Sequence, residues 1–345
     1  MDIRESWPEN FDEAQQAILE AGLGDGLPAV VPTRERLARM LSACGDAATT
    51  IAVLPPGYAD VSWRDVAYNA VMAGCSPACL CVVAAAVEAI AAPEFNLLGI
   101  ATTTGSATVC VVVNGPAARE IGMNAGVNAF GPGNRANATI GRALRLTLQN
   151  AGGARSGETD MATLGQPGKY TFCFAENEAE SPWPPLAVER GFDAGASVVT
   201  AFGVSGTIEV VDSESATGED LAQTYAQSML IPGNVGGSGL LGGGEPLIVM
   251  PPEHADVFVR SGMSKRDAKA AIYERARLSI DKLSPPLRER AKASGGAEDG
   301  YLRVAAKPED VTIVVAGGVG RKGAYVPTWS GGTRAVSRVI QNQKR

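Results

Sequence analysis

The chain has 345 residues, of which 45% are hydrophobic and 19% are charged. A chain of this length can bury a large core and usually divides into more than one folding unit. Its formal charge of −7 comes from 37 acidic and 30 basic residues, and the basic residues form no long run. This composition excludes overall disorder, and we expect no nucleic-acid partner.

The N-terminal residues carry acidic side chains where a signal peptide has a basic region and an apolar stretch. We therefore expect a cytoplasmic protein. The longest apolar stretch, residues 79–92, contains Glu88 and is shorter than the ~20 residues that span a bilayer. We expect no membrane partner.

Six cysteines lie at positions 44, 75, 79, 81, 110 and 173, without the paired CxxC spacing of zinc ribbons. In a chain without an export signal they are expected to be reduced thiols. The single histidine, His254, excludes a site that needs two imidazoles from one chain. The sequence does not specify a cofactor.

Residues 1–155 predict a first α/β unit. Capping patterns at Asn10, Thr33, Ser62 and Ser76-Pro77 predict four helices, the last running to about residue 92. Residues 51–56 predict a first buried strand. The β-branched run at 107–113 is typical of a strand covered on both faces, and a further helix is expected to begin near Asn134.

Residues 156–345 predict a second α/β unit, with an approximate boundary. Strands are expected at 169–178, 197–203, 207–212, 247–250 and in the run TIVV before Ala316. Residues 109–123 and 246–263 share one pattern, a buried strand, a helix begun by proline and then Gly-Met. A degenerate duplication or chance would explain this echo. The expected fold is α/β, with two intimately packed units and mixed or parallel sheets.

A glycine-rich loop that leads into a helix is the first candidate site. Gly131 and Gly133 let the backbone approach a ligand, and the helix that begins at Asn134 offers unpaired N–H groups. Arg135 and Arg142 lie two turns apart on nearly one face, which suits a carboxylate or phosphate. No nucleotide motif is present. The alternative is a capped helix with a long entry loop.

Cys75, directly before Ser76-Pro77, is the second candidate. A thiol beside a helix N-terminus can have its pKa lowered towards that of a nucleophilic thiolate. Cys79 follows four residues later, near enough to act as a resolving thiol. Burial in the core is the alternative for Cys75, and it is the simplest interpretation of the other cysteines in this region.

Cys173, with Glu176 and Glu178 after it and Lys169 before it, is the third candidate. A thiol, carboxylates and an amine within ten residues can supply a nucleophile, a general base and electrostatic support. Alternation along a strand places Lys169 on the same face as Cys173. Packing of the thiol and simple solvation of the acids are the alternatives.

Two further candidates involve helix starts and glycine turns. His254 lies in the first turn after Pro251-Pro252, where a neutral imidazole can act as a base, although a lone histidine is more often structural. Gly318 and Arg321, after the last buried strand, offer a backbone nest and a guanidinium for an anion. Asn114, at the turn that ends the strand 107–113, is also assigned to substrate binding.

Longer segments bear a family resemblance. NGPAAREIGMNAGVNAFGPGNRANATIGRALRL and GKYTFCFAENEAESPWPPL, within a match from Asp25 to Arg338, resemble a bacterial protein family often encoded beside small UGSC-motif (seleno)proteins. The resemblance implies that the candidate segments above belong to family motifs and that some share one pocket. It also hints at thiol or reductive chemistry. This chain has no UGSC sequence, so a redox partner of that type would be another protein.

We predict an enzyme that acts on a small anionic organic substrate by thiol chemistry, with hydrolytic, C–S-directed and reductive reactions all open. The nucleophile would be Cys75 or Cys173, the acid or base Glu176 or His254, and the anion ligands Arg135 and Arg321. One alternative is a ligand-binding subunit that serves a redox-active partner protein. Another is a metalloenzyme that uses Cys, Glu and His ligands. Assembly into a homo-oligomer stays open.

Overall fold

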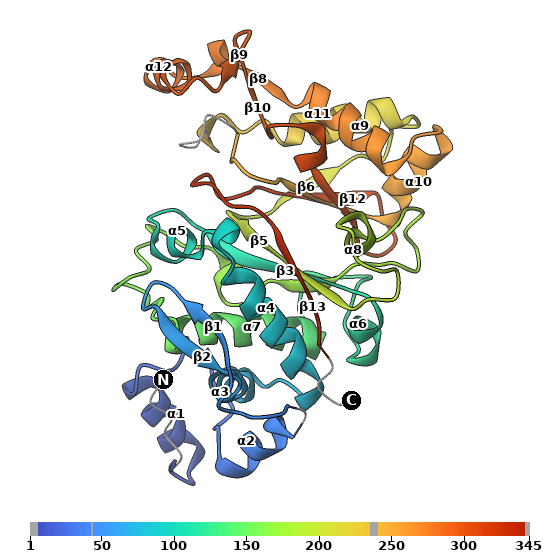
Figure 1. Ribbon diagram of the computed structural model, residues 1–345. Helices are drawn as coiled ribbons and strands as arrows, with labels where there is room; N and C mark the ends of the chain where they lie inside the picture. Colours follow the sequence, from blue (N-terminus) through green and yellow to red (C-terminus); the bar gives the residue numbers. More distant parts are fainter. Residues whose placement is uncertain (1–5, 43, 235–240, 342–345) are drawn as a thin grey trace.

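Two four-stranded sheets form the centre of the molecule (Figure 1). The computed structural model describes residues 6–42, 44–234 and 241–341. The chain is an α/β protein, as the sequence predicts, and both main sheets are mixed, with one parallel strand pair each.

The first sheet has the strand order β13-β5-β3-β4. Strand β3 is parallel to β4 and antiparallel to β5, and β5 is antiparallel to β13. The strands are β3 (Thr108–Asn114), β4 (Cys173–Ala175), β5 (Val198–Val204) and β13 (Val336–Val339).

The second sheet has the order β11-β7-β12-β6. Strand β7 is parallel to β11 and antiparallel to β12, and β12 is antiparallel to β6. The strands are β6 (Ile208–Val211), β7 (Leu247–Met250), β11 (Thr312–Val315) and β12 (Lys322–Val326).

The two sheets have the same order of strand directions. In chain order, β3, β4 and β5 form most of the first sheet, and β6 then crosses to the edge of the second sheet. Strands β7, β11 and β12 form most of the second sheet, and β13 crosses back to the edge of the first. This repeated topology, with exchanged last strands, is what a duplication would produce. The boundary between units that the sequence places near residue 155 lies between β3 and β4, the next strand of the first sheet along the chain.

The sheets pack face to face with helices outside them, giving four layers (Figure 1). Between the sheets lie side chains such as Val112, Phe174, Phe202 and Leu247. The outer layer of the first sheet consists of α3 (Trp63–Ala73), α4 (Leu80–Ile90) and α7 (Arg135–Asn150). The outer layer of the second sheet consists of α9 (Gly218–Ser228), α10 (Pro252–Arg260) and α11 (Lys265–Arg275).

The other regular elements are short. Strands β1 (Thr50–Leu54) and β2 (Ala59–Ser62) form a hairpin, and a three-stranded sheet contains β8 (Arg277–Ser279), β9 (Ala297–Glu298) and β10 (Tyr301–Arg303). The other helices are α1 (Phe11–Glu20), α2 (Arg34–Leu41), α5 (Leu97–Thr102), α6 (Pro116–Glu120), α8 (Leu186–Glu189) and α12 (Pro285–Ala293). Within the described ranges, no helix has the length and apolarity needed to cross a membrane.

Two strand predictions need correction. Residues 51–56 were expected to form a buried strand, but β1 lies in the separate hairpin and has exposed and half-buried residues. Residues 169–178 were expected to form one strand, but only Cys173–Ala175 pair with β3. Pro167 begins a 3₁₀ turn that includes Lys169, because proline at a first turn position favours helical backbone over an extended one.

Candidate functional site

Cys75 and Cys79 form a buried pair of thiols at the start of α4. Helix α3 ends at Gly74, whose φ of +88° is the left-handed conformation that glycine adopts readily. Ser76-Pro77 then begins a 3₁₀ turn that leads into α4. The chain thereby reverses direction, and the Cys75 and Cys79 thiols lie close enough for each to shift the pKa of the other. The Cys75 thiol donates to the Thr139 carbonyl oxygen at 3.3 Å, and the Cys79 sulfur lies 3.3 Å from the Ser76 hydroxyl.

The surroundings of this pair favour a negative charge on one sulfur. The Cys75 thiol, the Ser76 hydroxyl and backbone and the Arg135 guanidinium lower the pKa of Cys79 to about 6, against the effect of burial. The Cys79 side chain and burial raise the pKa of Cys75 well above its usual range. Both shifts favour a single proton for the pair, on Cys75 rather than on Cys79.

Cys75 also lines a cavity of about 310 Å³. Three arginines, Arg36, Arg39 and Arg135, line the same cavity, together with Ser76. Arg135, the first residue of α7, is oriented by donation from Nε to the Gly74 carbonyl at 2.9 Å. The structure therefore brings together two predicted site residues, a thiol and a guanidinium, in a cavity whose charge suits a small anion.

Cys173 occupies a different environment. Its side chain is buried in the core between β4 and α7, near the other thiols, and burial raises the pKa of its thiol. The backbone of α7 approaches Cys173 closely because Gly141 has no side chain. A Cβ at position 141 would lie 3.3 Å from the Cβ of Cys173. This packing supports a core role for Cys173 and leaves Cys75 as the thiol that lines a cavity.

Glu176 and Asn114 meet where β3 and β4 end. Glu176 Oε2 accepts hydrogen bonds from Asn114 Nδ2 at 2.6 Å and from the Leu186 backbone N–H at 2.8 Å. Glu178 Oε1 accepts from the same Asn114 amide and from the Gly115 N–H. Burial raises the pKa of the Glu176 carboxyl group. These two predicted site residues bind each other and fix the turn after β3.

His254 lies far from the thiols in the fold. It belongs to α10, in the outer layer of the second sheet, whereas Cys75 and Cys79 lie in the outer layer of the first sheet. Its ring is fully buried, with Nδ1 2.9 Å from the Tyr225 hydroxyl and Nε2 3.0 Å from the Asp212 carbonyl oxygen. Both nitrogens are thus engaged, which supports a structural role.

Arg321, Lys169 and Arg142 are engaged by the protein itself. Arg321 donates to the Ser213 carbonyl at 2.7 Å and to that of Ser215. Lys169 forms an ion pair with Asp160 at 2.7 Å rather than approaching a thiol. Arg142 forms a two-fold hydrogen bond with Asp25, both distances being 2.8 Å. These side chains therefore fix loops.

The two predicted glycine turns share one pocket of about 430 Å³, which Gly131 and Gly318 both line. The loops approach closely: a Cβ on Gly318 would lie 2.2 Å from a side-chain carbon of Val127. Gly133 has a φ of +115°, and Asn134 caps α7 by accepting from the Asn137 N–H at 2.9 Å. The sequence thus placed these turns correctly on loops, and the structure places two of the glycines together.

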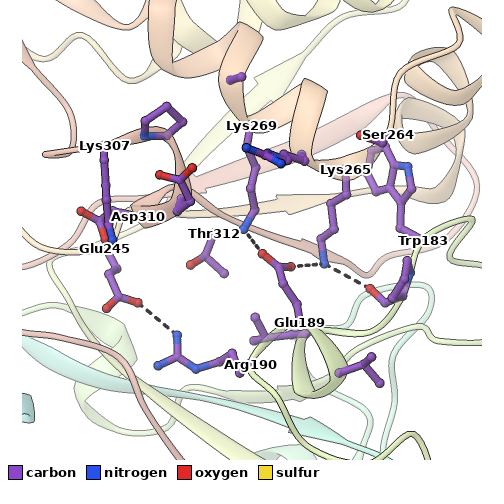
Figure 2. Close-up of a pocket in the computed structure, with 17 residues that line it drawn as sticks. Trp183, Glu189, Arg190, Glu245, Ser264, Lys265, Lys269, Lys307, Asp310 and Thr312 are labelled. Carbon is purple, nitrogen blue, oxygen red and sulfur yellow. Dashed lines mark hydrogen bonds and ion pairs between the residues drawn. The ribbon is translucent and has the colours of Figure 1, made fainter.

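A larger pocket, of about 910 Å³, was missed by the sequence analysis (Figure 2). Lys265 and Lys269, one turn apart on α11, point into it and both form ion pairs with Glu189. The sequence does contain one signal for it. Lys265 and Lys269 lie in the first turns of α11, near the positive end of the helix dipole, where a cationic side chain is unfavourable unless an anion compensates for its charge.

Comparison with known proteins gave no match among family models, curated proteins or solved structures. Within residues 6–42, 44–234 and 241–341, no three His, Cys, Asp or Glu side chains are grouped so as to hold a metal ion. The site is therefore defined by its own geometry.

Proposed function

We propose that this chain is an enzyme that acts on a small organic anion through the Cys75–Cys79 pair. The observation that carries the proposal is that Cys75 lines an arginine-rich cavity and has a second thiol, that of Cys79, beside it. Arg36, Arg39 and Arg135 would bind the anion and place its electrophilic atom beside the Cys75 sulfur.

Cys79 would activate Cys75. Cys75 is the sulfur on the cavity, but it holds the shared proton, and a neutral thiol is a poor nucleophile. As Cys75 attacks, its proton would leave the Thr139 carbonyl oxygen and pass to the neighbouring Cys79 thiolate. The pair then contains both the nucleophile and its base.

The second thiol favours reductive chemistry over hydrolysis. If the Cys75 sulfur attacks one sulfur of a small anionic disulfide, the other sulfur leaves as a thiolate. The first thiolate to leave takes the proton from Cys79, and the Cys79 thiolate so formed attacks the Cys75 sulfur of the mixed disulfide. This step releases the second thiolate and leaves a Cys75–Cys79 disulfide, so the two electrons come from the pair. A thiol or selenol protein would return these electrons. A UGSC-type partner, which the family resemblance implies, belongs to that chemical class.

Alkylation of the reduced protein tests the proposal without knowledge of the substrate. Iodoacetate and iodoacetamide attack the same thiols but differ in charge, so an arginine-rich cavity should favour iodoacetate at Cys75. The half-buried Cys44 serves as an internal reference in the same digest. We expect the iodoacetate-to-iodoacetamide rate ratio to be about tenfold higher at Cys75 than at Cys44, and Arg135→Met to lower it.

Equal rate ratios at both cysteines, unaffected by Arg135→Met, would contradict the anion cavity. Absence of a Cys75–Cys79 disulfide after oxidation by a small anionic disulfide would contradict the reductive assignment. Peptide mapping by mass spectrometry measures both results.

A further inference from the structure

The 910 Å³ pocket beside α11 is separate from the thiol pair and carries a second binding function (Figure 2). Its walls come from residues 183–190, the start of α11 and residues 307–312. We propose that this pocket binds a small organic anion, with a carboxylate or phosphate on Lys265 and Lys269 and an apolar body against Trp183 and Leu186.

The two lysines are the centre of the proposed site. Each side chain is 8% exposed, so both ammonium groups are nearly removed from water. They share one carboxylate: Lys265 Nζ lies 2.9 Å from Glu189 Oε2, and Lys269 Nζ contacts the other oxygen of the same group. Glu189 is the carboxylate that ion-pairs with both ammonium groups, while Glu176 acts on Lys265 and Glu245 on Lys269 without forming an ion pair among the described residues. Two nearly buried ammonium groups on one ion-paired carboxylate form a positive surplus that an anionic ligand would neutralise.

The other acidic residues of the pocket do not neutralise this surplus positive charge. Five basic and four acidic residues line the pocket. Glu245 pairs with Arg190 at 3.1 Å, and Asp310 pairs at 3.0 Å with Arg334, outside the lining. Two of the carboxylates are therefore already neutralised by arginines. The surplus positive charge lies on the α11 side, where Figure 2 shows Lys265 and Lys269 directed towards Glu189.

Two of the lining residues carry a buried polar atom without a partner in the described part of the chain. The Trp183 indole N–H and Asp310 Oδ2 have no hydrogen-bond partner among the described residues, although both side chains are more than nine-tenths buried. Such groups are costly unless something binds them.

Two pockets of the molecule are lined by related segments of the repeated topology. The 910 Å³ pocket is lined by the segment after β4 and by the chain that enters α11. The 430 Å³ pocket beside Gly131 and Gly318 is lined by the corresponding segments, the one that follows β11 and the one that leads into α7. Glu245 and residues 307–312 close the larger pocket at the amino ends of β7 and β11.

Calorimetric titration with phenyl phosphate, benzoate and inorganic phosphate tests the proposal. Phenyl phosphate carries the anionic group and the apolar body, benzoate distinguishes carboxylate from phosphate, and inorganic phosphate has no apolar body. We expect saturable binding of at least one aromatic anion. Lys265→Met or Lys269→Met should weaken it about tenfold, and Lys292→Met, on the exposed face of α12, should leave it unchanged.

Glu189→Gln provides the decisive variant, because it removes the internal carboxylate but keeps its shape. Both ammonium groups would then lack a counter-charge, so we expect the aromatic anion to bind about fivefold more tightly and to raise the unfolding temperature more than in the parent protein. This gain does not depend on a lysine variant that folds poorly.

Failure of phenyl phosphate and benzoate to bind either the parent or the Glu189→Gln protein would overturn the proposal. Binding that Arg135→Met abolishes while the Lys265→Met variant retains it would overturn it as well, because the anion would then occupy the thiol cavity.

Discussion

The side-chain amide of Asn114 donates to Glu176 Oε2 at 2.6 Å, while Glu176 Oε1 and Asn114 Oδ1 are buried without a partner among the described residues. Glu176 Oε1 and Asn114 Oδ1 are both acceptors, so a hydrogen bond between them requires a proton on one of the two oxygens. A protonated Glu176 could donate from Oε1 to Asn114 Oδ1 and form a reciprocal acid–amide pair. Burial, which raises the pKa of this carboxyl group, favours the same protonated form.

Glu176→Gln therefore tests the protonation state. A group whose pKa is raised in the folded protein stabilises it fully below the unfolded pKa, here 4.5, and loses that contribution as the pH rises through the folded value. Glutamine mimics the neutral acid at all pH values. We expect the variant to equal the parent in free energy of unfolding near pH 4.5 and to exceed it at alkaline pH, measured by urea denaturation.

Glu176→Ala is the matched control. It leaves the Asn114 amide and the Leu186 N–H without their acceptor and should be about 1–3 kcal/mol less stable than Glu176→Gln at every pH. A stabilising effect of glutamine that did not change with pH would contradict a protonated Glu176.

Cys79→Ser should shift the pH dependence of Cys75 alkylation. In the parent protein, the Cys75 rate should rise with an apparent pKa of about 6, because Cys79 must be deprotonated to accept its proton. Serine cannot supply that base, so the rate at neutral pH should fall by about tenfold and the midpoint should move to alkaline pH. Rates measured by peptide mapping at a series of pH values check this, and an unchanged midpoint would exclude Cys79 as the base.

His254 should contribute stability that depends on pH in the opposite direction. The Asp212 carbonyl can only accept, so Nε2 carries the proton and Nδ1 accepts from the Tyr225 hydroxyl. Burial lowers the pKa of His254 below 6.5. Its stabilising contribution is therefore complete above pH 6.5 and is lost as the pH falls below it.

Tyr225→Phe should remove the donor to Nδ1 and lower the free energy of unfolding by about 1–2 kcal/mol at neutral pH. His254→Gln should flatten the acid limb of the stability curve. Urea denaturation between about pH 5 and about pH 8 measures both effects, and a parent curve without an acid slope relative to His254→Gln would contradict a buried neutral imidazole.

Gly141→Ala should destabilise the contact between α7 and β4. A Cβ there would lie 2.4 Å from Thr171 Oγ1 and 2.7 Å from the Phe172 nitrogen, and the latter is backbone that cannot rotate away. We expect a loss of about 1–3 kcal/mol despite the better helix propensity of alanine. Ala138→Gly, on the exposed face of the same helix, measures the propensity effect alone, and a stabilised Gly141→Ala protein would contradict the close packing.

Local signals allowed much of the fold to be predicted from the sequence. Ser62 and Ser264 form capping boxes with Asp65 and Asp267, three residues away in each case, so both helix starts follow from short sequence patterns. The run at 107–113 is fully buried, as a strand between a helical layer and a second sheet must be. At these positions residues near in sequence set the backbone, and the predictions are confirmed.

The site depended on contacts between distant residues and was predicted only in part. Arg135 meets the backbone at Gly74 because α7 packs across α3, a relationship that no local pattern contains. The attraction of Lys265 to Glu189 likewise joins residues far apart in the chain. Periodicity gives the buried face of each element, but it does not give the neighbour that covers it.

The reciprocal crossing of β6 and β13 has a consequence for how the protein can lose its structure. A cut between β6 and β7 would leave each fragment with a foreign sheet's edge strand and a gap in its own, so neither fragment would bury its apolar surface alone. Each half thus completes the sheet of the other. Thermal melting should accordingly occur in one cooperative step, and co-expressed fragments should regain the fold only as a pair.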